Sequence, residues 1–251
     1  MSPRRILDPR SVPVSGTDSH LVALPASVLT AAAIRSRFAR AGVWHAELPG
    51  DGQPRGGAEE PGSDAVAVAS LDRSTRREPA HAAVLVPLVQ RDNGLNVLLT
   101  RRSEQLRDHA GQISFPGGRA EPEDAGPAAT ALREALEEVG LAPRHVEVIG
   151  LMPIYTTVTH FVVTPVVALV QPPFDLALDA SEVAEAFEVP LDYLMNPAHH
   201  RRHVVTFDGG QRQFLSMPWH GPDAAGGAER EFYIWGATAA MLRNLFRFLS
   251  D

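Results

Sequence analysis

Cysteine is absent from the 251 residues of the sequence. Its absence excludes disulfide bonds, thiolate metal sites and a cysteine nucleophile. Long apolar runs are missing too. No stretch approaches the roughly 20 residues of a membrane-spanning helix, and the N-terminus, MSPRRILDPRSVPVSG, lacks the apolar centre of a signal peptide. We therefore expect a cytoplasmic protein with no membrane partner.

Positive charge is in the minority, with 23 Lys and Arg against 30 Asp and Glu and a formal net charge of −7. Binding to nucleic acid irrespective of sequence needs a basic surface, so we expect no nucleic-acid partner. An anionic small-molecule substrate would need local arginines or metal ions. The hydrophobic content of 44% is ordinary for a globular protein.

The composition changes near residue 79. Residues 1–78 are predicted to form an N-terminal extension with one helix at about 26–41, followed by a flexible linker that contains GDGQPRGGAEEPGSD. Gly42 is the expected end of the helix. We interpret this helix as one that docks on the rest of the chain; the alternative is a helix that binds a partner.

Residues 79–251 carry the patterns of a folded domain. Apolar runs on either side of RDNG (91–94) predict a β-hairpin, and a second hairpin is predicted around DGG (208–210). Other predicted strands lie at 111–115, 145–157, 161–171 and 231–235, and an amphipathic helix is predicted at 236–250. Strands and helices do not alternate regularly, which favours a mixed α/β fold with antiparallel pairs.

The segment PAATALREALEEV (127–139) is predicted to be a helix with Pro127 in its first turn and Gly140 as its C-cap. At 100° per residue, Leu132, Leu136 and Val139 form an apolar stripe, and the opposite side carries carboxylates. Those carboxylates are Glu134, Glu137 and Glu138. A solvated acidic face is the simple explanation. However, Glu134 and Glu138 are like charges one turn apart and should repel, whereas a hard divalent cation would make the pair favourable.

The loop before this helix, FPGGRAEPED, places Gly117 and Gly118 after a strand. Glycine allows backbone to approach a ligand closely. The sequence that contains these glycines, the acidic loop and the acidic helix resembles the Nudix box. This motif is written G-x5-E-x7-R-E-U-x-E-E-x-G-U, where U is a bulky aliphatic residue. The matching positions are Arg133, Glu134, Glu137, Glu138, Gly140 and Leu141. Asp124 stands where the box has Glu, and one extra residue separates it from Arg133.

The segment LLTRRSEQLRDHAGQISFPGG (98–118) resembles L-L-T-x-R-S-x3-R-x3-G-x3-F-P-G-G, a signature of the Nudix hydrolases that act on coenzyme A. The resemblance covers about residues 80–250, and it departs at Thr159–His160, where a Ser-Gly-like pair is typical. It implies a Nudix fold: an α/β/α sandwich with a mixed sheet. It also implies metal-dependent cleavage of coenzyme A at its pyrophosphate, giving 4′-phosphopantetheine and adenosine 3′,5′-bisphosphate.

The resemblance also implies roles for single residues. Mg²⁺ or Mn²⁺ would be held by Glu134, Glu138, Glu137 and the Gly118 carbonyl. The general base would be a box glutamate or a downstream one, Glu182 or Glu185. We expect Arg133 to orient Glu137 or a loop carbonyl rather than to bind substrate. The expected substrate-binding residues are Arg102, Arg107, Ser103 and Gly117.

Two other patterns are interpreted as structural. The His199, His200 and His203 group is expected to be a solvated loop rather than a metal site. Phe232, Tyr233 and Trp235 are expected to be strand core rather than platforms on which bases stack. Two alternatives to coenzyme A hydrolysis stay open: another nucleoside diphosphate derivative such as NADH or ADP-ribose, and a non-catalytic regulatory module. A homodimer is also left open.

Overall fold

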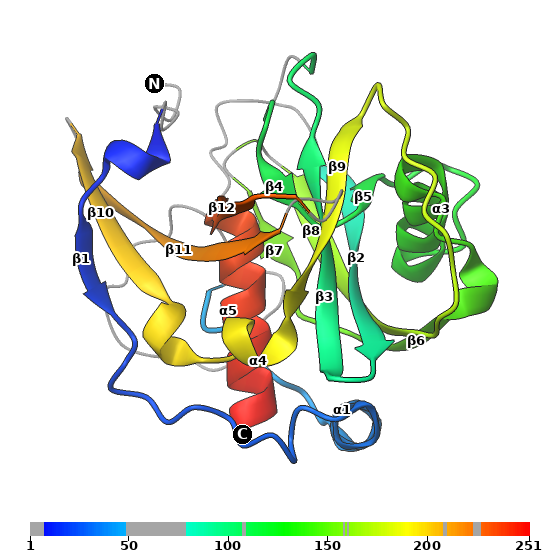
Figure 1. The fold of residues 1–251 in the computed structure, drawn as a ribbon, viewed down its shortest axis with the longest axis horizontal. Coiled ribbons are helices and arrows are strands. Elements are labelled where there is room, and N and C mark those ends of the chain that lie inside the picture. Colours follow the sequence, from blue (N-terminus) through cyan, green and yellow to red (C-terminus); the bar gives the residue numbers. More distant parts are fainter. Residues whose placement is uncertain are drawn as a thin grey trace.

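The computed structural model describes residues 8–48, 79–106, 109–157, 159, 161–207, 210–222 and 227–251. Most of the predicted linker therefore lies outside the described residues. Within them, eight strands form a central sheet in the order β4-β3-β2-β8-β6, with β5 on β2, β7 on β8 and β9 on β3 (Figure 1). Their bounds are β2 Ala80–Arg91, β3 Gly94–Arg102, β4 Ile113–Ser114, β5 Gly117–Arg119, β6 Val146–Leu151, β7 Tyr155–Thr156, β8 Phe161–Val170 and β9 Val183–Pro190.

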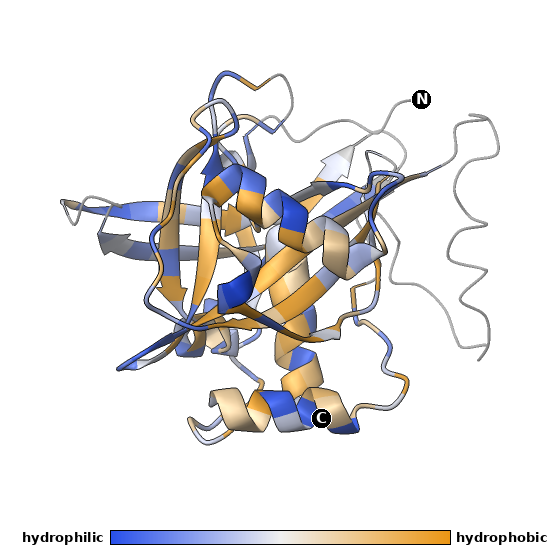
Figure 2. Ribbon diagram, turned by 90° about the vertical axis from the view of Figure 1, so that its right-hand side faces the viewer, coloured by the Kyte–Doolittle hydropathy of each residue, from blue (hydrophilic) through white to orange (hydrophobic). Residues whose placement is uncertain are grey.

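The sheet is mixed, as predicted. β2 and β3 form the expected antiparallel hairpin, which closes at the Arg91–Gly94 pair. β2 pairs with β8 in parallel over its other edge. Most of β8 is buried on both faces, which is usual for a strand covered by structure on either side, and Figure 2 shows the apolar character of these strands.

Helices cover both faces of this sheet. α3 (Pro127–Val139) packs on one face through a core that includes Leu85, Leu98 and Val166. α5 (Gly236–Ser250) and α1 (Ala31–Arg40) lie on the other face (Figure 1). The three layers are the predicted α/β/α sandwich. The short helices are η1 Pro9–Ser11, η2 Pro143–His145, α4 Leu191–Leu194 and η3 Pro197–His199.

A second sheet has the order β1-β10-β11-β12 and lies beside α5 (Figure 1). The predicted second hairpin is present as β10 (Arg201–Phe207) and β11 (Gly210–Pro222), and β12 (Glu229–Trp235) follows it. The first strand, β1 (Val14–Thr17), was not predicted. All four of its residues are exposed, so it lacks the apolar alternation that marks a strand.

The N-terminal helix is present but shorter than the predicted 26–41. It begins at Ala31 because the Thr30 hydroxyl caps it by accepting a bond from the Ala33 N–H (3.2 Å). It ends at Arg40, and its C-cap Ala41 has an extended backbone, so Gly42 is not needed as a left-handed cap. Ile34 is fully buried and Phe38 packs on Phe248 of α5, with ring centroids 4.5 Å apart. This packing favours the docking interpretation of the helix.

Buried charges also join the N-terminal residues to the domain. Asp18 is fully buried and pairs with Arg202 of β10 (Nη2–Oδ2, 3.0 Å) and Arg243 of α5 (Nη1–Oδ2, 3.2 Å). Glu47 accepts a bond from the Nη2 of Arg243 (2.9 Å). Removing one partner of such a buried pair leaves the other charge uncompensated. These contacts tie residues 8–48 to the second sheet and to α5, and the domain boundary at residue 79 stays a prediction.

The prediction that the histidine group lies in a solvated loop is wrong for His200 and His203. His200 and His203 are buried, and their ring nitrogens contact the Leu194 and Val12 carbonyl oxygens. The loop is buried because η3 and β10 pack between β1 and β11.

Candidate active site

Helix α3 has the ends that the sequence predicts. Pro127 occupies its first position, and Gly140 ends it in the left-handed region at φ 71°. A side chain at residue 140 would meet the backbone of Ala177, whose nitrogen would lie 2.8 Å from a Cβ. Glycine therefore satisfies both the backbone conformation and the space at this end.

The buried face of α3 differs from the predicted stripe of Leu132, Leu136 and Val139. Ala131, Ala135 and Val139 are fully buried, whereas Leu136 is 46% exposed. Small alanines let the helix approach β2 closely, and this rotates the buried face away from the larger leucines. The rotation takes Glu138 into the interior, where it is only 3% exposed. The carboxylates therefore do not form one solvated face.

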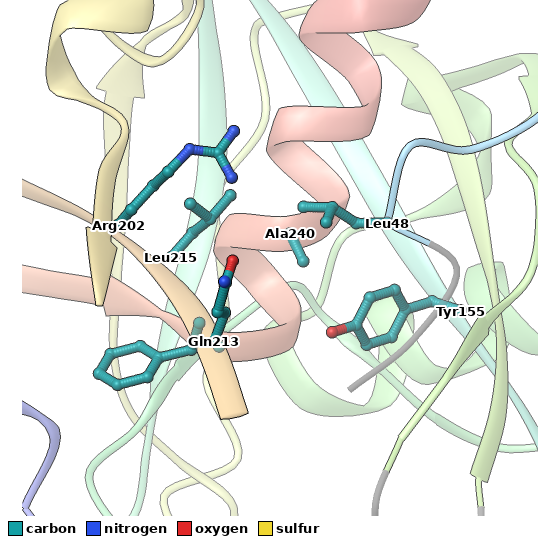
Figure 3. Close-up of a pocket in the computed structure, with 8 residues that line it drawn as sticks. Leu48, Tyr155, Arg202, Gln213, Leu215 and Ala240 are labelled. Carbon is teal, nitrogen blue, oxygen red and sulfur yellow. The ribbon is translucent and has the colours of Figure 1, made fainter. Parts of the chain in front are cut away.

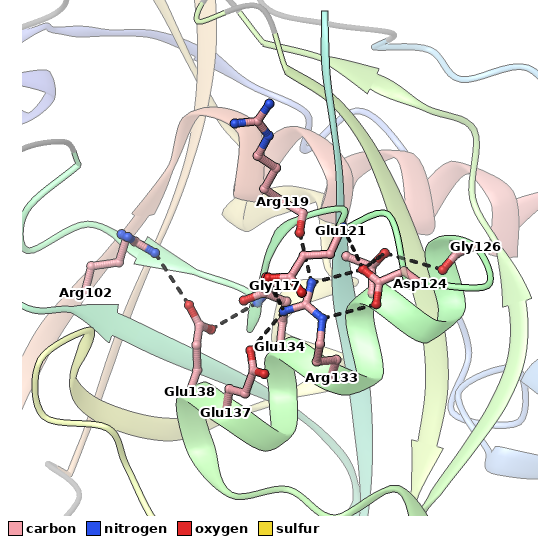
Figure 4. Close-up of polar contacts among 11 residues, drawn as sticks. Arg102, Gly117, Arg119, Glu121, Asp124, Gly126, Arg133, Glu134, Glu137 and Glu138 are labelled. Carbon is pink, nitrogen blue, oxygen red and sulfur yellow. Dashed lines mark hydrogen bonds and ion pairs between the residues drawn. The ribbon is translucent and has the colours of Figure 1, made fainter.

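Glu138 lies between the glycine turn and an arginine. Its Oε2 accepts a bond from the Gly117 N–H (3.0 Å), and its Oε1 lies 3.6 Å from the Nη1 of Arg102 (Figure 4). Burial raises the pKa of this carboxyl from 4.5 to about 7, and the Gly117 bond and Arg102 oppose the shift. Near neutral pH this group would give up a proton when it meets a cation.

Glu134 lies against Gly118. A Cβ on residue 118 would come within 2.5 Å of the Glu134 carboxylate, so only glycine leaves room for it. Burial raises the pKa of Glu134, while its contact with Arg133 opposes the rise. The backbone of the two glycines is thus in contact with both carboxylates of the predicted metal pair.

Arg133 is the centre of a network that holds the helix and the preceding loop together (Figure 4). Its Nη1 donates to Glu134 (3.0 Å) and Glu137 (2.9 Å), and its Nη2 donates to the Arg119 carbonyl (3.0 Å). A hydrogen bond to Asp124, followed by those to Glu134 and Glu137, raises the pKa of Arg133. The arginine contacts both the carboxylate and the kind of loop carbonyl that the sequence predicted.

The contacts of Asp124 explain how this sequence can differ from the usual Nudix box. It has Asp in place of Glu and one extra residue before Arg133. The two oxygens of Asp124 accept bonds from the Nε (3.1 Å) and Nη2 (3.0 Å) of Arg133, and also from Thr130 Oγ1 (2.8 Å) and the Glu121 N–H (2.9 Å). These bonds, led by Arg133, hold the pKa of Asp124 well below its usual range. A shorter side chain therefore reaches the arginine from a loop that is one residue longer.

Across the described ranges, no group of three or more His, Asp or Glu side chains converges as a ready metal cluster. Glu134 and Glu137 are held by Arg133, and Glu138 contacts Arg102. The carboxylates repel one another because they carry the same charge, and the positive charges of Arg133 and Arg102 offset this repulsion. The donor set nevertheless fits a hard divalent ion, because carboxylate oxygens and a glycine backbone lie together here and such ions prefer oxygen.

The two downstream glutamates differ in their surroundings. Glu182 is exposed, and its charge contributes to the raised pKa of both Glu134 and Glu138, so it lies near them. Its carbonyl accepts a bond from the Ser103 N–H (2.8 Å). Glu185 is 6% exposed and pairs with Arg101 (3.3 Å) and with Arg230. Of the two, Glu182 is the one whose side chain is exposed and can therefore face a substrate.

A cavity of about 290 Å³ adjoins this network. Arg102, which contacts Glu138, lies in its wall, and so do residues 109 and 112–115 of the segment before the glycines. Its other wall comes from β11, the end of β12 and the start of α5, which the sequence did not point to. A much smaller cavity of about 40 Å³ lies beside α5 between Leu48, Tyr155 and Gln213 (Figure 3).

The remaining predicted substrate residues have these positions. Ser103 is 5% exposed, and its Oγ accepts a bond from the Gln105 N–H (3.4 Å), so its hydroxyl stabilises a turn. Gly117 donates to Glu138. Arg107 lies outside the described residues. None of the helices in the described part of the chain is long and apolar enough to cross a membrane.

The family model of the NUDIX domain matches residues 79–208, which include the glycine turn, α3 and Arg102. This chain belongs to the Nudix family. This Nudix chain is 41% identical over 165 residues to an uncharacterized Nudix hydrolase, NudL, of Citrobacter koseri. The aligned residues cover 65% of this chain and 80% of that relative. A NudL of Escherichia coli K12 is 39% identical over 165 residues, with the same coverage.

Among solved structures, a Nudix hydrolase from M. smegmatis, RenU, matches 49% of this chain and 78% of its own, with 23% identity and a TM-score of 0.40. The match to the NUDIX family model, together with the mixed sheet between helices, confirms the Nudix fold that the sequence resemblance implied. The curated relatives place the chain in a family of hydrolases.

Without metal, the protein is expected to be more stable as Glu138→Gln than as wild type at pH 8. The Glu138 carboxyl binds its proton more tightly in the folded protein than in the unfolded chain. Its contribution to the free energy of unfolding is therefore fully present below pH 4.5 and is lost as the pH rises through about 7. At 1.36 kcal/mol per pKa unit, burying the charged form costs about 3 kcal/mol at pH 8. Melting curves in EDTA should show the variant about 5–10 °C more stable at pH 8 and equal to wild type near pH 4.5.

Glu137→Gln is the matched control for this experiment, because that side chain is 58% exposed. It should not reproduce the pH-dependent gain. A Glu138→Gln variant that melts at or below the wild-type temperature at pH 8 would show that burial of Glu138 carries no such cost.

Proposed function

We propose that this Nudix hydrolase cleaves the pyrophosphate bond of coenzyme A or its derivatives with Mg²⁺ or Mn²⁺, giving 4′-phosphopantetheine and adenosine 3′,5′-bisphosphate. One observation carries the substrate class. Part of the segment that matches the coenzyme A signature, namely Arg102, His109 and residues 112–115, lines the cavity beside Glu138. The part of the sequence that sets this branch apart is thus the part that a substrate at the carboxylates would touch.

In this proposal the metal is held by Glu134, Glu138 and Glu137, with the Gly118 carbonyl as a further ligand. A bound divalent cation would neutralise the pyrophosphate and lower the pKa of a water molecule. Arg133 positions the carboxylates, because its rigid fork holds Glu134, Glu137 and the Arg119 carbonyl at once. Asp124 fixes that fork from the opposite side.

Arg102 is assigned to the pyrophosphate. It is 25% exposed, lines the cavity and lies 3.6 Å from Glu138, so it can contact an anion bound beside that carboxylate. A guanidinium matches phosphate oxygens bidentately. Glu182 is the preferred general base, because it is exposed and close enough to raise the pKa of Glu134 and Glu138.

A substrate panel tests the proposal. The purified protein with Mg²⁺ or Mn²⁺ is given coenzyme A, dephospho-coenzyme A, NADH and ADP-ribose at equal concentrations, and the products are separated by chromatography. We expect the highest kcat/KM on coenzyme A. A preference for NADH or ADP-ribose would overturn the substrate class, and the absence of any turnover would favour a non-catalytic module.

A further inference from the structure

The second sheet contributes a row of three side chains to the cavity. Arg212 and Phe214 lie on β11, and Trp235 ends β12. Alternate residues of a strand share one face, and Trp235 pairs with Ser216, the next residue on the face that carries Arg212 and Phe214. All three lie beyond residue 208, where the match to the family model ends. This wall therefore lies outside the residues that the NUDIX family model matches, although it lies within the span of about 80–250 over which the sequence resembles the coenzyme A branch.

The wall combines a flat aromatic surface with a cation. Phe214 is 6% exposed and meets Trp235 edge-on, with ring centroids 5.6 Å apart and planes at 75°. Trp235 itself is only partly buried, so part of its indole faces the cavity. The prediction of strand core is confirmed for Phe232, which is 2% exposed, whereas Trp235 is buried only in part. Trp235 is the residue that precedes α5, and it lines the cavity.

His203 fixes the wall in place. Its ring stacks on Phe214 with centroids 4.5 Å apart and planes at 5°. Its Nε2 lies 2.8 Å from Ser216 Oγ, and its Nδ1 lies 2.9 Å from the carbonyl oxygen of Val12. At 2% exposure His203 has little freedom to move. The N-terminal segment thus holds a surface that lines the candidate active site.

The two arginines of the cavity come from different sheets. Arg102, on β3, is engaged with Glu138 and is assigned to the pyrophosphate. A coenzyme A substrate carries a further dianionic group, the 3′-phosphate on its ribose, next to an adenine ring. The wall of the second sheet offers both complementary groups, since arginine binds phosphate bidentately and an indole stacks on a base. The cavity of about 290 Å³ is close to the size of small ligand pockets, roughly 300 Å³.

We propose that Trp235 and Arg212 bind the adenosine 3′-phosphate end of the substrate, with the adenine ring against the indole and the phosphomonoester on the guanidinium. This proposal rests on the proposed function and deepens it. It assigns the recognition of the 3′-phosphate to a residue of the second sheet and leaves Arg102 with the pyrophosphate.

The test compares wild type, Arg212→Gln and Trp235→Ala on coenzyme A and dephospho-coenzyme A. Arg212→Gln should lower kcat/KM on coenzyme A by about 10- to 100-fold, mainly through KM, and leave dephospho-coenzyme A nearly unchanged. Trp235→Ala should lower kcat/KM on both substrates by about tenfold, and Trp235→Phe should restore most of it. Arg144→Gln, an exposed arginine of η2, is the matched control.

Binding provides a second readout that does not depend on turnover. Calorimetry with adenosine 3′,5′-bisphosphate and with AMP should show a preference for the bisphosphate in wild type and no preference in Arg212→Gln. If wild type does not hydrolyse coenzyme A but keeps this preference, the proposed function fails and the site stands. An equal effect of Arg212→Gln on both substrates and both ligands, or no effect on any, would overturn the site.

Discussion

Replacing Glu138 by Gln is expected to lower kcat with Mg²⁺ by about 10³-fold. Metal ions supply several kcal/mol of charge stabilisation in phosphoryl chemistry, and Glu138 is the most buried of the three box carboxylates. Glutamine keeps the size of the side chain and an oxygen that can accept the Gly117 bond, but it carries no charge for a cation. Glu134→Gln should have a similar effect, and Glu137→Gln a smaller one because that side chain is exposed and already paired with Arg133.

Steady-state rates on coenzyme A at saturating metal provide the measurement. Glu123→Gln is the matched control, since Glu123 is an exposed glutamate of the same acidic loop and should retain full activity. Circular dichroism would verify that each variant is folded. If Glu138→Gln kept more than a tenth of the wild-type turnover, the metal assignment would be wrong.

Replacing Gly117 by alanine is expected to lower the stability of the protein, whereas replacing the adjacent Gly118 by alanine is expected to lower kcat. At Gly117 the backbone has φ 155°, and a Cβ would lie 2.4 Å from the Ala83 carbonyl oxygen and 2.6 Å from the Val84 Cα. Backbone atoms of a central strand cannot move aside, so Gly117→Ala should destabilise the fold by roughly 2–4 kcal/mol. At Gly118 the clash is with the Glu134 carboxylate, which can swing away.

Gly118→Ala should therefore fold almost normally and lose about 100-fold in kcat, because displacing a reacting or metal-binding group by about 1 Å costs that much. Thermal melting and initial rates, measured on the same preparations, separate the two effects. Gly42→Ala is the control, since nothing lies within 4 Å of a Cβ there. A Gly118→Ala variant with normal activity would mean that the position of Glu134 does not matter for catalysis.

Local patterns predicted much of this molecule. Both hairpins lie where turn residues interrupt apolar runs, and α3 begins at Pro127 and ends at Gly140 as expected. The carboxylates and the glycine turn are neighbours in sequence, so their meeting could be predicted without knowledge of the rest of the fold. Asp124 could have been recognised as the partner of Arg133 from its charge and its place in the acidic loop.

Features that depend on shape or on distant pairing could not be predicted in this way. A helical wheel ranks residues by polarity, yet the close approach of α3 to β2 selects Ala131 and Ala135 by their size and leaves Leu136 exposed. β1 is exposed at every position and pairs only through its backbone. The wall of Arg212, Phe214 and Trp235 exists only because a second sheet packs beside α5, which no local pattern records.

The contact between Val12 and His203 has a consequence for the order of folding. The bond between Gly117 and Glu138 joins residues only 21 apart, whereas Ser15 Oγ bonds to the Arg202 carbonyl 187 residues away. Contacts between distant residues carry a larger loop-closure entropy and form later. The acidic helix and its glycine turn can thus assemble while the aromatic wall is still incomplete. A newly made chain would acquire the carboxylates of the proposed metal site before it acquires the surface that we propose binds the adenosine end of the substrate.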